Sequence, residues 1–180
     1  MKKIAFILFV MASHLISNGC LAQTSKTNKP KIVVGLMVDQ MRWDYLYKYQ
    51  DRYREGGFKR LLAQGFSCEN TMIRHAPTVT AAGHSSVYTG SVPAINGIVE
   101  NEWYDRSWGR EISNVEDSTV TGVGGDLKQN RSPRNLLTTT IGDELRIATN
   151  YQSKVVGISI KDRAAILPGG HTANAAFWEG

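Results

Sequence analysis

A threonine at the start of an expected helix is the first residue in this sequence whose type and place suit catalysis. Pro77 disfavours helix at the residue before it, and the small residues that begin at Thr80 then allow a helix to start. Free backbone N–H groups and the positive end of the helix dipole meet at such a terminus, which suits a phosphate or sulfate group. The alternative interpretation is that Thr78 or Thr80 simply caps the helix.

An aspartate directly follows a strongly apolar run. Residues 31–38 (KIVVGLMV) are continuously apolar and rich in β-branched side chains, which is typical of a strand buried in a parallel sheet. In an open α/β sheet, functional groups collect beyond the carboxyl ends of the strands. Asp39 is therefore a candidate metal ligand or base, with a turn or helix cap as the alternative.

Two cations follow a second run of this kind. Residues 154–160 (KVVGISI) predict another buried parallel strand, and Lys161 and Arg163 come immediately after it. We expect both to emerge at the same edge of the sheet as Asp39. Asn101 lies just past a group of turn-forming residues, 90–97, and adds an amide to this set.

The remaining segments must position these side chains. The pattern predicts an α/β fold in which a mostly parallel sheet is sandwiched between helices. The expected elements are a short helix or ordered loop at 41–53, a helix at 57–65, a strand at 66–74, an irregular surface excursion at 105–132 and a helix at 133–149. Cys68 falls inside the expected strand 66–74 and is interpreted as a small buried hydrophobic residue.

Together these residues make a set that can handle an anion. A divalent metal on Asp39 would favour the alkoxide of Thr80, while helix-end N–H groups and the two cations neutralise the oxygens of a transferring phosphoryl group. Composition alone does not separate this chemistry from simple anion binding. His75 and His84 are further candidates, although an isolated histidine is more often structural than a ligand.

The first residues have the pattern of an export signal. Two lysines precede an apolar run that is too short for a membrane span, and small side chains at Cys20 and Ala22 fit cleavage after residue 22. We expect residues 1–22 to be a signal peptide, residues 23–30 a flexible lead-in, and the protein to be periplasmic or secreted. The alternative is a lipoprotein anchored through Cys20, the one case in which we expect membrane attachment.

Charge and cysteine content exclude some functions. With the expected leader removed, Cys68 is the only cysteine, so no intrachain disulfide is available. The formal net charge is +5 and would fall by two on loss of Lys2 and Lys3. Basic residues form no longer run than Lys59-Arg60, so the sequence carries no nucleic-acid-binding footprint.

Five segments taken together resemble the N-terminal part of the alkaline phosphatase superfamily. Within it, the chain is most similar to exported bacterial zinc alkaline phosphatases that use threonine as the nucleophile. The segments are KIVVGLMVDQMRWD (31–44), GGFKRL (56–61), APTVTAAGHSSVYTGSVPAINGIVENEWYD (76–105), SPRNL (132–136) and KVVGISIKDRAAIL (154–167).

The resemblance implies a role for each candidate. Thr80 would be the nucleophile that becomes phosphothreonine, and Asp39 a ligand of the zinc ion that activates it. Asn101 would donate a hydrogen bond to a phosphoryl oxygen, and Lys161 and Arg163 would contact the transferred group. The implied substrates are phosphorylated small molecules, and the implied cofactor is two zinc ions in the full-length enzyme.

The chain departs from the family pattern in two ways. Relatives often carry His-Gly-Ile where this sequence has Asn96-Gly97-Ile98, which affects a turn rather than the chemistry. Family members also supply further Asp and His zinc ligands from a later portion. We therefore expect residues 31–180 to be the N-terminal part of a longer catalytic domain, and this part alone to be inactive.

Three functions remain in competition. Phosphate monoester hydrolysis is favoured because Lys161 and Arg163 would both face the extra charge of a monoester. A phosphodiesterase or nucleotide pyrophosphatase of the same superfamily is the alternative, and a non-catalytic anion-binding relative is the third. A sulfatase is disfavoured because Cys68 does not open a Cys-x-Pro-x-Arg motif.

Overall fold

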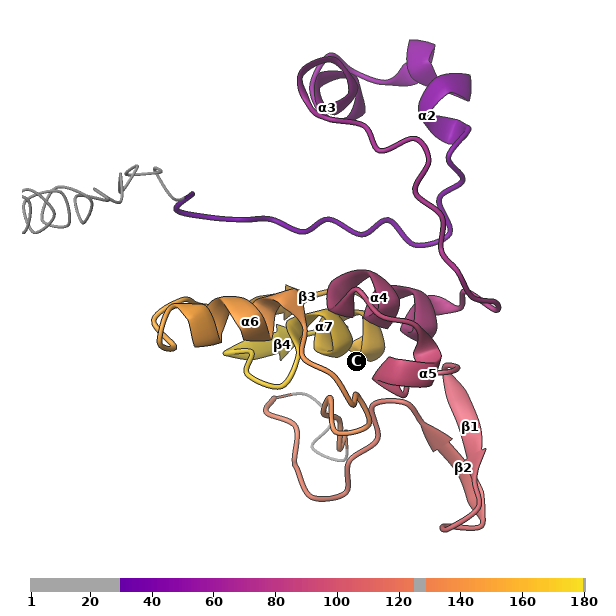
Figure 1. Cartoon of the computed structure of the whole chain (residues 1–180), viewed down its shortest axis with the longest axis vertical. Coiled ribbons are helices and arrows are strands. Elements are labelled where there is room, and N and C mark those ends of the chain that lie inside the picture. The colour runs from indigo at the N-terminus through magenta and orange to yellow at the C-terminus, as the bar shows by residue number, and fades with distance from the viewer. Residues whose placement is uncertain (1–29, 125–128, 180) are drawn as a thin grey trace, which may run out of the picture. The chain divides into compact units, whose positions relative to one another are not determined.

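The computed structural model describes residues 30–124 and 129–179, in a chain that divides into two units, 1–36 and 37–180. The expected signal peptide and all but the last residue of the lead-in lie outside the described residues. The described elements, labelled in Figure 1, are α2 (Tyr45–Lys48), η1 (Gln50–Arg52), α3 (Phe58–Gln64), α4 (Thr80–Thr89), α5 (Pro93–Asn96), β1 (Glu102–Asp105), β2 (Arg110–Ser113), α6 (Ile141–Ala148), β3 (Val156–Ile158), α7 (Asp162–Gly169) and β4 (Ala175–Phe177).

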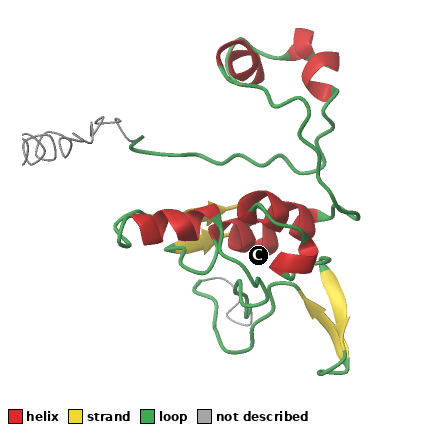
Figure 2. Ribbon diagram, in the orientation of Figure 1, coloured by secondary structure: helices red, strands yellow, loops and turns green. Residues whose placement is uncertain are grey.

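The hydrophobic core forms where α4 packs against α7, side by side in Figure 2. Its buried side chains come from these two helices and from the loops before β1, after β2 and before α6. They are Ala81, Ile98, Val115, Leu136, Ile166 and Leu167. Each large apolar side chain removed from water contributes about 1.5 to 3 kcal/mol, so this cluster holds α4 and α7 together.

Helix α4 begins and ends as its sequence predicts. Val79 is the extended N-cap residue, Thr80 is the first helical residue, and the helix ends at Gly90 in the left-handed conformation, with φ of 65°. The first six residues of the helix, from Thr80 to Ser85, are all buried. The expected helix start at Thr80 is therefore confirmed. The small side chains at the start of the helix let neighbouring segments approach it closely.

The strand expected at 154–160 is confirmed in a shorter form, β3, but the burial expected for it was wrong, because Val156 and Ile158 are exposed in the described structure. β3 pairs in parallel with β4, with Gly157 opposite Ala176. A Cβ atom on Gly157 would lie 2.0 Å from the carbonyl oxygen of Ala165, so only glycine lets α7 lie this close to β3. β3 and β4 form one of two two-stranded sheets among the described residues, and the other is the antiparallel hairpin of β1 and β2.

The strands expected at 31–38 and 66–74 are not present in the described structure. Residues 31–38 are extended, but they have no ladder partner among the described residues, and Ile32, Val34 and Leu36 are more than 70% exposed. Residues 66–74 contain a turn in which the N–H of Thr71 donates to the carbonyl of Cys68. An apolar run indicates that a segment favours burial. A β-strand also needs a neighbouring strand to form hydrogen bonds with its backbone, and the apolar pattern does not show whether one is present.

Cys68 is exposed, so its interpretation as a buried residue was wrong. Its burial was inferred from the strand expected around it. Because that strand has no partner in the part of the chain that the structure describes, no sheet covers the thiol.

The helix expected at 133–149 begins later, at Ile141. Thr140 and Asp143 form a capping box, in which each side chain bonds the backbone N–H of the other residue, and this motif sets the helix start. The preceding residues turn instead, with the N–H of Leu136 donating to the carbonyl of Pro133. The apolar spacing over 133–140 was therefore wrongly interpreted as helical.

The excursion expected at 105–132 is only partly irregular. It contains β2, and Ile112, Asn114, Val115 and Asp117 within it are buried. The abundance of glycine and polar residues hid the hairpin, because β2 pairs with β1, which lies mostly outside that range.

Two other local expectations agree with the structure. Residues 41–53 contain the short helices α2 and η1. The helix expected at 57–65 is α3, although its C-cap Gly65 is extended, with φ of −96°, rather than left-handed.

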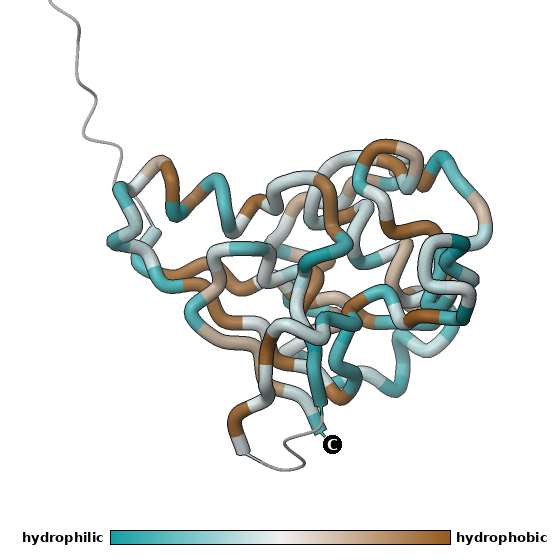
Figure 3. Tube along the Cα trace, turned by 90° about the horizontal axis from the view of Figure 1, so that it is seen from below, coloured by the Kyte–Doolittle hydropathy of each residue, from teal (hydrophilic) through white to brown (hydrophobic). Residues whose placement is uncertain are grey.

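Many large hydrophobic side chains remain exposed in the described structure. Figure 3 shows hydrophobic stretches, in brown, distributed along the whole trace rather than gathered in one place. None of the helices described is both long enough and apolar enough to span a membrane.

Candidate active site

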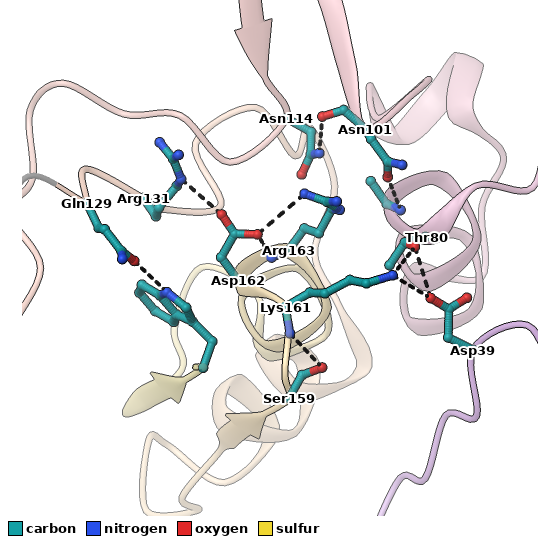
Figure 4. A network of polar contacts seen from close by, with 12 residues as sticks. Asp39, Thr80, Asn101, Asn114, Gln129, Arg131, Ser159, Lys161, Asp162 and Arg163 are labelled. Atoms are coloured by element: carbon teal, nitrogen blue, oxygen red, sulfur yellow. Dashed lines mark hydrogen bonds and ion pairs between the residues drawn. The ribbon is translucent and has the colours of Figure 1, made fainter. Parts of the chain in front are cut away.

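Three polar atoms meet at the start of α4 (Figure 4). The hydroxyl of Thr80 donates a hydrogen bond to Oδ2 of Asp39 over 2.9 Å. The ammonium group of Lys161 lies 3.3 Å from the same carboxylate oxygen and 3.4 Å from Oγ1 of Thr80. Thus a hydroxyl, a carboxylate and a cation touch one another.

Three separate segments deliver these atoms. Asp39 lies in the turn that follows residues 31–38, and one of its oxygens accepts from the N–H of Gln40. Thr80 opens α4, and Lys161 is the N-cap residue of α7. Because α4 packs against α7, the starts of both helices contribute to one place.

The carboxylate of Asp39 is held in its ionised form. Partial burial acts to raise its pKa, but hydrogen bonds from Thr80 and Lys161 and the charge of Lys161 outweigh that effect. The pKa of Asp39 is therefore lowered. At neutral pH this side chain offers anionic oxygens, as a ligand for a metal ion must.

Asn101 approaches the same helix terminus from the other side. Its Oδ1 accepts a hydrogen bond from the backbone N–H of Ala81 over 3.0 Å. One of the N–H groups that the sequence analysis assigned to an anion is thus occupied by a side chain. The bond also orients the amide, leaving Nδ2 of Asn101 to donate elsewhere.

A buried asparagine holds the main chain of Asn101. Both the backbone N–H and the side-chain Nδ2 of Asn114 donate to the carbonyl oxygen of Asn101, the backbone bond measuring 3.1 Å. The side chain of Asn135 donates in turn to the carbonyl of Asn114. The backbone at Asn101 is therefore tied to the loop that follows β2.

Arg163 does not join Thr80 in the way that Lys161 does. Its guanidinium lies 3.6 Å from Oδ1 of Asp162, and the other oxygen of Asp162 accepts from Nε of Arg131 over 2.9 Å. The two expected cations thus start from the same helix but have different partners. Figure 4 shows Lys161 reaching toward Thr80, and Arg163 pointing toward the loop of Asn114.

The two histidines have different surroundings. Nδ1 of His84 lies 2.7 Å from the carbonyl oxygen of Thr80, one helical turn earlier, and the ring is buried. His75 is half-buried, and neither of its ring nitrogens has a hydrogen-bond partner among the described residues. His84 thus has a structural contact, as an isolated histidine usually does.

The turn at Asn96 is stabilised by the asparagine itself. Oδ1 of Asn96 accepts from the N–H of Ile98 over 2.9 Å, and its Nδ2 donates to the carbonyl of Ser91. The departure from His-Gly-Ile therefore leaves a fully buried residue that still bonds the turn.

The chemistry of Asp39 and Thr80 suits a metal ion, because each offers an oxygen atom to a cation. The ammonium group of Lys161 already contacts both oxygens. Zinc normally takes four donors. Across residues 30–124 and 129–179, no group of three His, Cys, Asp or Glu side chains is placed to hold a metal. Asp39 and Thr80 by themselves therefore fall short of the four donors that zinc normally takes.

The candidate site is identified by the polar atoms that converge there, and its residues do not line the cavity found in the described structure. A cavity of about 670 Å³ lies elsewhere, lined by Arg131, Ile166, His171 and Trp178 among others. None of Asp39, Thr80, Asn101, Lys161 and Arg163 lines it.

Comparisons with known proteins agree with this architecture. Residues 33–180 match the family model described as type I phosphodiesterase / nucleotide pyrophosphatase. The chain is 62% identical over 151 residues to alkaline phosphatase PhoV of Synechococcus elongatus, covering 83% of this chain and 28% of that protein. It is 60% identical over 156 residues to a protein of Myroides odoratus named calcium-transporting ATPase, covering 86% and 28%.

A third relative shares its name with a protein of solved structure. Alkaline phosphatase PafA of Elizabethkingia meningoseptica is 53% identical over 168 residues, covering 91% of this chain and 31% of that protein. A crystal structure of wild-type alkaline phosphatase PafA superposes with a TM-score of 0.80 at 56% identity, over 83% of this chain and 29% of that one. The α/β fold class is thereby confirmed, and the chain spans less than a third of the length of these relatives.

The fold and the helix-start site define an α/β protein of the alkaline phosphatase superfamily. More narrowly, the chain belongs to the type I phosphodiesterase / nucleotide pyrophosphatase family and is homologous to the PafA and PhoV alkaline phosphatases.

The sequence analysis missed three residues that support the site. Asp162 stands between the two expected cations, and this position could have suggested a partner for Arg163. Asn114 and Arg131 carry no such signal, because they lie within the Gly-rich stretch and contact the site only through the fold.

Proposed function

We propose that a protein carrying this chain hydrolyses phosphate monoesters through a covalent intermediate on Thr80. The observation that carries the proposal is the contact of the Thr80 hydroxyl with both Asp39 and Lys161 at the start of a helix. The names of the PhoV and PafA relatives support it. Because the matched segment covers only 28% and 31% of these two relatives, the proposal concerns a full-length protein that contains these residues.

A second solved structure supports the choice of residues. It is a variant of alkaline phosphatase PafA in which one Thr is replaced by Ser and one Asn, one Lys and one Arg are replaced by Ala. The replaced Thr and Asn have the same separation in sequence as Thr80 and Asn101, and the Lys and Arg are two positions apart, as Lys161 and Arg163 are. We assign the corresponding roles to these four residues.

In the first step, Oγ1 of Thr80 attacks the phosphorus of the monoester. The Oγ1–P bond forms, the bond to the alcohol oxygen breaks, and the alcohol leaves with a proton. Asp39 orients the hydroxyl through the 2.9 Å hydrogen bond, and the ammonium of Lys161 favours the alkoxide. Nδ2 of Asn101 donates to a phosphoryl oxygen, and Arg163 balances the charge of the dianion.

In the second step, water cleaves the Oγ1–P bond and releases inorganic phosphate, and Thr80 regains its proton. We propose zinc as the cofactor, held in part by Asp39 and Thr80, where it would lower the pKa of the hydroxyl and of the attacking water. The remaining ligands would come from outside the described residues.

The intermediate gives the direct test. A full-length protein that contains this chain is mixed with a phosphate monoester, quenched in acid and digested, and we expect phosphate on the peptide that carries Thr80. Phosphate on another residue, or turnover with no phosphopeptide at any quench time, would overturn the covalent mechanism.

Diester or pyrophosphate hydrolysis is the second candidate function, favoured by the description of the matching family. Parallel assays with a monoester, a diester and ATP separate the candidates, and ATP is included because one relative is named an ATPase. We expect the highest kcat/KM for the monoester. Zinc binding without turnover of any of the three would favour an anion-binding relative.

Export remains a proposal that rests on residues 1–22, which the structure does not describe. We propose cleavage after Ala22 and a periplasmic or secreted enzyme. Mass spectrometry of the mature N-terminus should find it near Gln23. A diacylglyceryl group on Cys20 would instead show a membrane-anchored protein.

A further inference from the structure

Asn114 is a fully buried asparagine whose contacts lead to the proposed active site. It follows β2 and is 0% exposed. Its backbone and side-chain N–H groups both donate to the carbonyl oxygen of Asn101, so two bonds fix one peptide group. A buried residue that donates from both its backbone and its side chain to the main chain of Asn101 restricts where the Asn101 side chain can point.

The other end of the same side chain has no partner. Oδ1 of Asn114 is buried and accepts no hydrogen bond from the residues that the structure describes. Nε of Arg163 is likewise buried and unpartnered among them. One atom is an acceptor and the other a donor, and a buried polar atom left without a hydrogen bond is costly.

The two unpartnered atoms belong to side chains that face each other. In Figure 4, Asn114 lies between Asn101 and Arg163, with its side-chain oxygen toward the guanidinium. Nη1 of Arg163 lies 3.6 Å from Oδ1 of Asp162, so the guanidinium is only loosely held on that side.

We propose that Asn114 is a positioning residue that couples Asn101 to Arg163. Its Nδ2 holds the main chain of Asn101, and its Oδ1 accepts from the guanidinium of Arg163 when a phosphoryl group is bound. One side chain thereby sets the spacing of two donors that contact the same transferred group. The inference rests on the proposed function and adds to it a residue that does not itself touch the substrate.

A double-mutant cycle in a full-length protein that contains this chain tests the proposal. Asn114→Ala is made alone and in the Asn101→Ala and Arg163→Ala backgrounds, and kcat/KM for a phosphate monoester is measured together with inhibition by inorganic phosphate. We expect Asn114→Ala alone to lower kcat/KM by about 5- to 50-fold and to weaken phosphate inhibition in parallel. In either background the further loss should be smaller than in the unsubstituted protein, because one of the two couplings is already absent.

Asn96→Ala is the matched control. Asn96 is also an asparagine with 0% exposure, but its side chain bonds the turn at Ser91 and Ile98. We expect this variant to lower the melting temperature, while any loss of kcat/KM is the same with and without Asn101→Ala. Equal losses for Asn114→Ala in all three backgrounds would overturn the proposal and leave Asn114 a structural residue.

A second variant covers the case in which Asn114→Ala does not fold. Asn114→Asp keeps an oxygen toward Arg163 and loses the side-chain donor to Asn101 while the backbone N–H remains, so coupling to Arg163 should survive and coupling to Asn101 should weaken. Loss of both couplings, or of neither, would contradict the assignment of the two ends. If Asn101→Ala by itself costs less than about twofold, the phosphoryl-binding role assigned to Asn101 under the proposed function fails, which is a separate outcome.

Discussion

The side-chain oxygen of Asn101 accepts a hydrogen bond from the backbone N–H of Ala81, the residue directly after Thr80. A backbone N–H is only a donor, so the atom of Asn101 that faces it must be the oxygen. The amide nitrogen is then left to donate, one peptide unit from the proposed nucleophile. Helix α4 therefore orients Asn101 as well as placing Thr80.

Replacing the nucleophile should abolish most turnover. In a full-length enzyme, Thr80→Ala should lower kcat by roughly 1000-fold or more, because no covalent intermediate can form. Thr80→Ser should keep measurable turnover, since it retains the hydroxyl. Steady-state assays give the rates, while circular dichroism and inhibition by inorganic phosphate check that fold and binding persist. Full turnover by Thr80→Ala would place the nucleophile elsewhere.

Replacing both cations should separate monoesters from diesters. Lys161→Ala with Arg163→Ala should slow monoester hydrolysis strongly, each lost charge-assisted contact costing on the order of 1.5 to 3 kcal/mol. Diester hydrolysis should suffer less, because one oxygen is esterified and the charge is lower. We measure kcat/KM for both substrates, and an equal loss would reject the selectivity argument.

The single variants refine this expectation. Lys161 touches both Thr80 and Asp39, whereas Arg163 is paired with Asp162. Lys161→Ala should therefore slow both substrates, and Arg163→Ala should carry most of the difference between them. Reversed behaviour of the two variants would show that the cations have exchanged roles when substrate is bound.

Stability should depend on a buried carboxylate outside the proposed site. Asp143 accepts hydrogen bonds from Thr140, His171 and Thr172, at distances from 2.7 to 3.2 Å. Asp143→Asn would turn an amide toward some of these donors and should cost roughly 2 to 4 kcal/mol of unfolding free energy. Urea unfolding gives the value, and Glu144→Gln, an exposed change in the same helical turn, should cost less than about 1 kcal/mol.

The same residue sets a pH dependence. Burial acts to raise the pKa of Asp143, but the hydrogen bonds from Thr140, Thr172 and His171 outweigh it, so the pKa is lowered in the folded protein. The stabilisation is therefore complete above the unfolded pKa of about 3.9 and is lost as pH falls through the lower folded value. Asp143→Asn should flatten the stability profile in that acidic range. A profile as steep as that of the unsubstituted protein would assign the acid sensitivity to other groups.

Zinc should bind weakly to residues 1–180 by themselves. Asp39 and Thr80 supply two oxygens where zinc normally takes four donors, so we expect no high-affinity site in equilibrium dialysis and no phosphatase turnover. Asp39→Asn should remove what weak binding there is. Tight zinc binding that survives Asp39→Asn, or rapid hydrolysis by this chain free of contaminating phosphatase, would show that the site is misplaced.

The sequence by itself determined the local features around each functional residue. Pro77 and the small residues after it placed Thr80 at a helix start, and the apolar run at 31–38 marked Asp39. The run at 154–160 placed Lys161 and Arg163 directly after a strand. These signals are short-range, because a cap, a proline or an apolar run acts on neighbours a few residues away.

Only the tertiary structure decided which of these residues touch. Lys161 reaches Asp39 across 122 positions and Thr80 across 81, through the packing of α7 against α4. The fold also brought Arg131 onto Asp162, beside Arg163, and Asn114, from the loop after β2, onto Asn101. Such contacts depend on how buried surfaces pack against each other across the core. Local propensity along the chain does not determine that packing, so the sequence pattern did not predict these contacts.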